Sequence, residues 1–203
     1  MATTVTVYKN TDARAPEMIG TTPQALASGL INVLDKCLVV GYGAKAAAGW
    51  TKPFTSTYNA AFRPAAGNRF YFQVYENASG TAAMLCHFKG FETMTAIDTG
   101  TGPFPVSVAY YTLPLTDTSG LARPWVVVAD DRTVYLFADR ANNLYYAGIV
   151  FGDTFSYTAA DGYRRGMFGG SDGFVNTTGL GQLVTSITSA SQAHVMARSY
   201  TGT

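Results

Sequence analysis

Charged residues are scarce in this sequence. Asp, Glu, Lys and Arg make up 13% of its 203 residues, whereas about 25% is usual in soluble domains. Aromatic residues account for another 13%, so a monomer of this size has little charge with which to cover its surface. We therefore expect other subunits to cover part of that surface.

The charges that are present nearly cancel. The net charge is +1, and no run of Lys or Arg is longer than the pair Arg164-Arg165. Proteins that bind nucleic acid or anionic membranes usually carry a strong basic field, so the sequence predicts neither partner. The start of the chain lacks a basic segment followed by an apolar one, and no apolar run approaches the roughly 18 residues of a membrane span. Synthesis in a cytosol, without export by that route, is expected.

Cysteine and histidine, which often carry chemistry, occur only twice each. Cys37 and Cys86 lie in apolar stretches and in no CxxC or Cys/His cluster. They are predicted to be free thiols in the core, with a disulfide or a metal site as the less favoured alternative. His87 and His194 accompany no catalytic motif and are predicted to be core or surface residues. The sequence predicts no metal, no cofactor and no catalytic residue.

Strand-forming residues, by contrast, are abundant. The stretch 122–151 contains three apolar, β-branched or aromatic runs at 125–129, 133–138 and 144–151, separated by polar breaks. Each run has the length of a strand and each break has the composition of a turn, so the pattern predicts an antiparallel three-stranded meander. A turn is expected at Gly152-Asp153, and glycines thin the pattern from Gly166 onward. Further strands are expected at 5–8, 51–56, 58–63, 69–75, 81–91, 106–115 and 154–158.

One helix is expected. Thr22-Pro23 is a typical helix start, and Leu26, Leu30, Val33, Leu34 and Cys37 follow at helical spacing on one face. The predicted fold is mainly β: a single antiparallel β-sandwich or distorted barrel with one α-helix near 23–38. We expect an N-terminal strand and arm at 1–22, a β-rich core domain at 23–183 and a Ser/Thr-rich C-terminal arm at 184–203. Because its composition offers few apolar residues, the last segment is expected to extend over a surface or a partner, or to be partly disordered.

Two features have both a functional and a structural interpretation. The glycine-rich stretch 41–50 lacks the spacing of a P-loop or a dinucleotide site, so we expect unusual torsions or a close backbone approach rather than a phosphate cradle. Asp130, Asp131 and Asp153 could supply the carboxylate pair of a polysaccharide hydrolase. Adjacent Asp residues at a hairpin tip are more often turn formers, which is the favoured interpretation here.

Interface residues are predicted from two patterns. The segment 69–75 has one apolar face and one amphipathic face, and the amphipathic face suits contact with a neighbour. A small charged group after the meander, and an arginine before it, suit salt bridges between subunits, which contribute about 0–1 kcal/mol when exposed. The interface candidates are Tyr71, Tyr75, Tyr110, Tyr111, Arg123, Arg164 and Arg165.

Eight segments occur in order between about residues 7 and 170: Tyr8 to Pro16, Gly41 to Phe54, Phe91 to Met94, Asp98 to Pro105, Arg123 to Thr133, Phe151 to Asp153, Ser156-Tyr157 and Tyr163-Arg164. Together they resemble a widespread family of structural proteins in the virions of tailed bacteriophages. The resemblance implies a non-enzymatic particle component, made in the host bacterial cytoplasm. It is expected on the capsid surface as a head decoration or cement protein that binds the major capsid protein and itself, as a homo-oligomer such as a trimer. A tail, collar or fibre component that binds a host surface or glycans is the alternative, and a virion polysaccharide hydrolase is less favoured.

Overall fold

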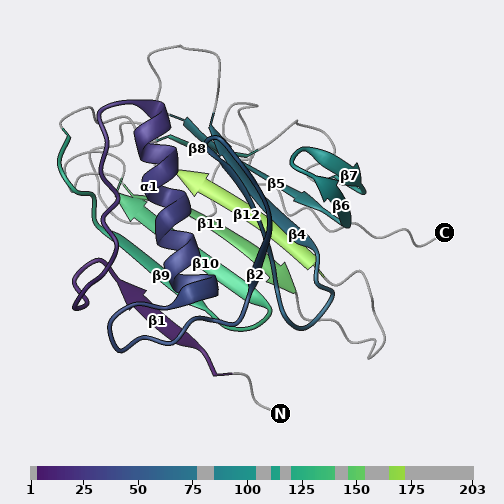
Figure 1. Cartoon of the computed structure of the whole chain (residues 1–203), viewed down its shortest axis with the longest axis horizontal. Helices are drawn as coiled ribbons and strands as arrows, with labels where there is room; N and C mark the ends of the chain where they lie inside the picture. The colour runs from purple at the N-terminus through teal and green to yellow at the C-terminus, as the bar shows by residue number, and fades with distance from the viewer. Residues whose placement is uncertain are drawn as a thin grey trace.

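The computed structural model describes residues 4–76, 85–103, 111–114, 120–139, 146–153 and 165–171. Two five-stranded antiparallel sheets and a small hairpin account for the strands of these ranges (Figure 1). The first sheet contains, in spatial order, β1 (Thr6–Lys9), β9 (Trp125–Ala129), β10 (Thr133–Asp139), β11 (Tyr146–Asp153) and β12 (Arg165–Ser171). The second contains β2 (Thr51–Ser56), β3 (Asn59–Arg63), β4 (Tyr71–Glu76), β5 (Leu85–Phe91) and β8 (Tyr111–Pro114).

The predicted fold class is confirmed. The structure is mainly β with a single α-helix, and no strand of the described ranges pairs across the two sheets, so the architecture is a sandwich and not a closed barrel. The predicted meander is also confirmed, because β9, β10 and β11 are neighbours in the first sheet. β1 forms the edge of that sheet beside β9.

The helix begins where the sequence predicts. α1 (Pro23–Asp35) has Thr22 as its N-cap, and the Thr22 hydroxyl accepts the backbone N–H of Ala25 at 3.2 Å, which satisfies one of the free donors of the first turn. The helix continues as a π-helical turn, η1 (Lys36–Val40), and stops at Gly41, whose φ is +87°.

One core joins the helix to both sheets. The apolar face of α1, from Leu26 to Leu34, is buried, and it lies against β3, β4 and β5 of the second sheet. η1 reaches β2 in the second sheet and β9 in the first. The rings of Phe72 in β4 and Phe151 in β11 stack at a centroid distance of 4.8 Å, so the sheets also contact each other directly. Burial of these groups supplies the main favourable term in folding.

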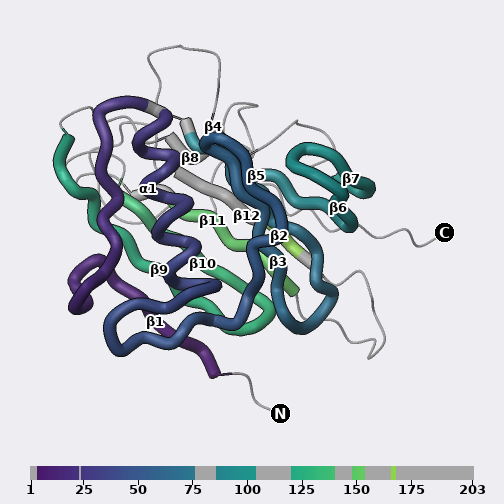
Figure 2. The backbone as a smooth tube through the Cα atoms, in the orientation of Figure 1, coloured from purple at the N-terminus to yellow at the C-terminus, as the bar shows by residue number. Residues whose placement is uncertain are grey.

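A second, smaller cluster covers part of the outer face of the second sheet. The hairpin of β6 (Thr93–Ala96) and β7 (Thr99–Thr101) projects beside β5 (Figure 2) and brings Met94 and Ile97 against Ala61, Phe91 and Tyr71. The backbone N–H of Asp98 donates to the side chain of Gln73 at 2.8 Å, and Gln73 is only 1% exposed. Part of the amphipathic face that the sequence assigned to a neighbour is therefore covered within the chain.

Two sequence expectations are corrected at the end of the meander. Gly152 and Asp153 were expected to form a turn, but they are the last residues of β11 and pair with Gly166 and Arg165 of β12. The glycines from Gly166 onward were expected to interrupt the pattern, yet β12 runs through three of them. Local residue propensity does not predict this strand, because backbone pairing with the neighbouring strand β11 forms it.

The N-terminal segment is more tightly bound than an arm. Tyr8 and Met18 are fully buried in the main core, and the indole N–H of Trp125 donates to the carbonyl of Pro16 at 3.0 Å. The described part of the segment, residues 4–22, is therefore anchored to the core through Tyr8 and Met18. The expected C-terminal arm at 184–203 lies outside the described residues, as do the strand expected at 154–158 and parts of those expected at 81–91 and 106–115.

Candidate interaction surface

The first sheet exposes an apolar outer face. Its inward side chains, among them Trp125, Leu136 and Phe151, are buried in the core. Antiparallel sheets with one face in water usually alternate apolar and polar residues, but here most of the described outward positions are apolar as well, with Lys9 and Thr133 among the polar exceptions. We call this surface the outer sheet face and define it by Val5, Val7, Val126, Val128, Tyr135, Phe137 and Val150.

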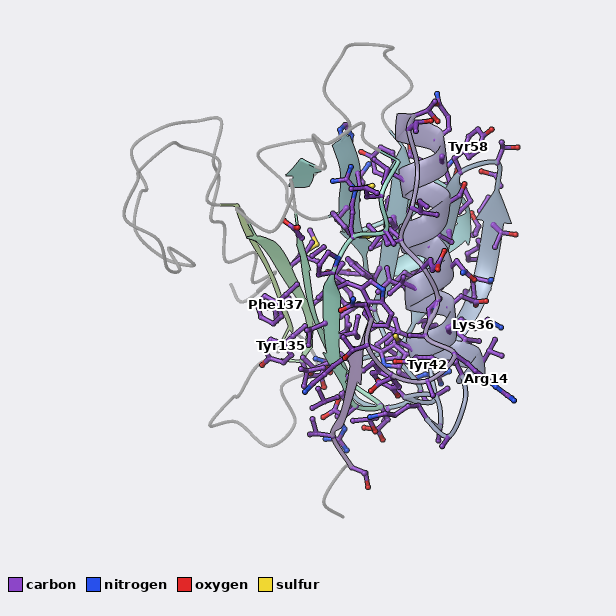
Figure 3. All side chains as sticks on the ribbon, turned by 90° about the vertical axis from the view of Figure 1, so that its left-hand side faces the viewer. Arg14, Lys36, Tyr42, Tyr58, Tyr135 and Phe137 are labelled. Carbon is purple, nitrogen blue, oxygen red and sulfur yellow. The ribbon has the colours of Figure 1, made fainter. Side chains whose placement is uncertain are left out.

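The strand register aligns these side chains in rows. Val7 is opposite Val128, Val128 is opposite Tyr135, and Tyr135 is opposite Val150. Val5, Val7 and Tyr135 are 59%, 40% and 43% exposed, and the other four are half-buried. Figure 3 shows Tyr135 and Phe137 on the side of the sheet that faces away from α1. Val5 precedes β1, and the other six side chains come from β1, β9, β10 and β11. Apolar side chains that gather on the exposed face of a monomer often mark a binding site.

Phe137 has a structural role within this face. Its cross-strand partner is Gly148, and a Cβ added to Gly148 would lie 3.0 Å from the Phe137 ring. The ring therefore covers the bare backbone of a glycine that is itself buried. Cross-strand pairs of this kind stabilise sheets that contain glycine. Tyr135, which has no such glycine opposite it, is the better residue with which to test binding.

The free edge of β1 is partly closed by side chains. The Lys45 ammonium, from the glycine-rich loop, donates to the carbonyl of Val7 at 2.8 Å, and the backbone N–H of Lys9 donates to the Asp12 carboxylate at 2.8 Å. An edge whose backbone groups are already paired is less open to a further strand. A partner of the first sheet would therefore meet its face more readily than its β1 edge.

The loop depends on glycine, as the sequence predicted. Gly43 has φ +55°, and a Cβ there would lie 2.5 Å from the carbonyl oxygen of Ala13. This close approach places Tyr42 beside Asp12, whose carboxylate accepts the Tyr42 hydroxyl at 2.9 Å and lies 3.7 Å from the Lys45 ammonium.

The same contacts shift two pKa values. Burial, and then the hydrogen bond to Asp12, raises the pKa of Tyr42. For Asp12, desolvation acts against ionisation, but the Lys9 backbone N–H, the Tyr42 hydroxyl and the Lys45 ammonium together hold its pKa below the usual value. Asp12 is therefore a charged anchor for the loop at neutral pH.

The carboxylates that suggested a hydrolase have structural partners. The side chain of Asp130 accepts the backbone N–H groups of Arg132 and Thr133 at 2.8 and 2.7 Å, which confirms it as a turn former. Asp131 lies 3.7 Å from the Arg132 guanidinium. The carboxylate of Asp153 accepts the backbone N–H of Asn68 and so connects the two sheets.

Of the interface residues predicted from the sequence, those whose side chains the structure describes, Tyr71, Tyr75 and Arg123, do not lie on the outer sheet face. Tyr71 is half-buried, contacts Phe54 at a centroid distance of 6.0 Å and lies under the Arg63 guanidinium at 4.9 Å. Tyr75 is half-buried against His87. The backbones of Tyr111 and Arg165 lie in β8 and β12, and Tyr110 and Arg164 lie outside the described residues.

Arg123 differs most from its expected place. It is only 5% exposed, and its backbone N–H donates to the carbonyl of Met18 at 2.9 Å. The isolated chain therefore does not present Arg123 for a salt bridge with a neighbour. Sequence reasoning missed the outer sheet face, although a signal was present: apolar residues occupy both the odd and the even positions of 125–129, which is typical of strands covered on both faces.

Within the described ranges, no helix combines the length and the apolar character needed to cross a membrane. Those same residues contain no group of three or more His, Cys, Asp or Glu side chains that could hold a metal ion.

No protein-family model, curated protein or solved structure matches the chain.

Proposed function

We propose that this chain is a non-enzymatic structural protein of a tailed-phage virion, and that it decorates and stabilises the head by binding the major capsid protein. The observation that carries the proposal is the outer sheet face, an apolar surface of a low-charge protein that a partner would cover. A small patch of this kind on many copies suits a protein that binds a repeated lattice, because each contact can be modest while the assembly engages many of them. Its location is then the capsid surface, after synthesis in the host bacterial cytoplasm.

The segments that resemble the virion family support the proposal in a second way, because they contact one another. The indole N–H of Trp50 donates to the carbonyl of Asp130 at 2.7 Å, and the ring of Trp50 packs against Phe151 at 6.2 Å. The backbone N–H of Asn10 donates to the carbonyl of Trp125 at 3.1 Å. The resembling segments are therefore neighbours in the folded chain, although they are far apart in the sequence.

The first test is copy number in purified virions of the phage that encodes the chain. A decoration protein should be present at a level comparable with the coat protein, and densitometry of stained gels measures this directly. A few copies per particle would instead indicate the tail, collar or fibre component, whereas absence from the particle would overturn the virion role altogether.

The second test addresses the surface. Tyr135→Lys places a charge that would be buried without a partner in the interface, so particles assembled with this variant should lose the protein on heating or chelation. Tyr58→Lys is the matched control, because Tyr58 is 41% exposed against 43% for Tyr135 and the two lie on opposite sides of the molecule (Figure 3). Equal retention of both variants would contradict the assignment of this face.

A further inference from the structure

A polar groove lies on the side of the molecule away from the outer sheet face. It runs between the exposed side of α1 and the hairpin of β2 and β3, has a volume of about 290 Å³ and opens to solvent. Ser28 and Asn32 of the helix are exposed along one wall, and Thr55 and Tyr58 are exposed along the other. Its size is at the lower end for small-ligand sites.

Tyr58 occupies a backbone position that does not favour a tyrosine. It lies in the turn between β2 and β3 with φ +60°, a conformation in which glycine or asparagine is much less strained. The turn is held by the next residue, because the Asn59 amide donates to the carbonyl of Thr57 at 2.9 Å and to the Ser56 hydroxyl at 3.0 Å. The tyrosine ring is therefore not needed for the turn, and a strained residue kept at an exposed site is grounds for inferring a function.

The groove contains one ion pair. The Lys52 ammonium and the Asp35 carboxylate are 2.8 Å apart, and their side chains are 28% and 18% exposed. Because the two charges offset each other, the groove has no excess charge with which to select a phosphate or another ion. The pair nevertheless presents a fixed donor and a fixed acceptor, next to the amide of Asn32 and the hydroxyl groups of Ser28 and Thr55.

We propose that this groove binds a neutral saccharide unit, a hexose or N-acetylhexosamine of a polysaccharide. A sugar ring has an apolar C–H face that can pack on the exposed Tyr58 ring, and its hydroxyl groups can pair with the donors and acceptors of Asn32, Asp35 and Lys52. An apolar peptide would leave these polar groups without partners on burial. If the outer sheet face is seated on a particle, the groove on the opposite side faces outward.

The inference is tested on the isolated full chain, so its outcome is independent of the virion assignment. The probe is an array of bacterial surface polysaccharides with neutral and anionic repeat units, followed by calorimetric titration of the best neutral binder. Tyr58→Gly should weaken the affinity about tenfold, the upper range for one aromatic contact, without lowering the melting temperature. Asn32→Ala should also weaken it, whereas Tyr58→Phe, which keeps the ring, should retain most of it.

Tyr135→Ser is the control, since it removes an equally exposed tyrosine from the other side of the molecule. It should leave saccharide binding unchanged. The proposal is overturned if no neutral glycan binds, if only anionic glycans bind, or if Tyr58→Gly and Asn32→Ala both bind as well as the native chain. Loss of particle retention in Tyr135→Lys with intact saccharide binding would support both assignments separately.

Discussion

The carboxylate of Asp153 accepts the backbone N–H of Asn68, with its two oxygens at 3.2 and 3.3 Å from the nitrogen. Asp153 ends β11 in the first sheet, and Asn68 lies in the loop between β3 and β4 of the second. Gly67 makes the approach possible: its φ is +71°, and a Cβ there would overlap the Asp153 carboxylate. A residue that could have been catalytic thus ties the two sheets together.

Replacing Asp153 or Gly67 should destabilise the fold. Asp153→Ala removes a hydrogen bond to a charged acceptor and should lower the free energy of unfolding by about 1–2 kcal/mol. Gly67→Ala adds both backbone strain and overlap and should cost at least about 2 kcal/mol. The double variant should lose less unfolding free energy than the two single variants lose together, because removing the carboxylate relieves the overlap. Urea unfolding measures all three.

Gly49→Ala separates the backbone strain of such a substitution from its steric overlap. Gly49 has φ +90°, but a Cβ there would meet nothing within 4 Å. It should therefore show the strain without the overlap and cost less than Gly67→Ala. Equal costs for the two alanine variants, or strict additivity in the Gly67/Asp153 cycle, would contradict this account of the contact.

Lys45 should protect the edge of the first sheet. Lys45→Ala frees the carbonyl of Val7, to which the ammonium donates at 2.8 Å, and should change the free energy of unfolding by less than about 1 kcal/mol because Lys45 is 38% exposed. An open edge strand invites pairing with other chains, so sedimentation velocity should show concentration-dependent association beyond that of the native chain. Lys36→Ala, which removes a positive charge elsewhere, should not cause this association. If both variants associate alike, the loss of charge is the cause and not the exposed edge.

Local features of this fold could be predicted from the sequence. The Thr22 cap, the Asp130 turn and the strands of the meander depend on residues close together in the chain, so composition and spacing identify them. The need for glycine in the loop that contains Gly41 and Gly43 could also be predicted from the sequence. What spacing could not show is which distant segment each glycine approaches.

Features that depend on strand order could not be predicted. The outer sheet face exists because β1 pairs with β9, more than a hundred residues later in the chain, and nothing local specifies that pairing. β12 has the composition of a loop but becomes a strand by pairing with β11. The burial of Arg123 and the strained turn at Tyr58 are likewise consequences of tertiary contacts, which override local preference.

Both cysteines should be inert in the folded protein. The structure confirms the predicted free thiols, and Cys37 and Cys86 are 0% and 1% exposed. Burial is the main cause that raises the pKa of Cys37, and the reactive species is the thiolate. Ellman's reagent should therefore react with neither thiol in buffer and with both in urea. Fast reaction of either thiol under native conditions would show that its surroundings open readily.

His87 should make the protein sensitive to mild acid. It is 2% exposed beside Tyr75, and burial lowers its pKa from 6.5 to about 4. Above pH 6.5 the imidazole is neutral in both states, so its contribution is fully present. As the pH falls from 6.5 toward 4, the unfolded state takes up the proton first and stability is lost. The difference between the two pKa values corresponds to an upper limit of roughly 3 kcal/mol.

Urea unfolding at intervals between pH 7.5 and pH 4 should be used to follow this loss; the window is set by the His87 pKa values. His87→Gln, which cannot take up the proton, should flatten the profile in this window, although the substitution itself lowers stability at neutral pH. His194→Gln is the matched control and should keep the native slope. The pKa of Asp12 is held below its usual value of 3.8, so its contribution is lost mainly below pH 4 and overlaps only the lower end of this window. A native profile that is flat between pH 6.5 and 4, or a slope that His194→Gln removes, would show that His87 is not the acid-sensitive group.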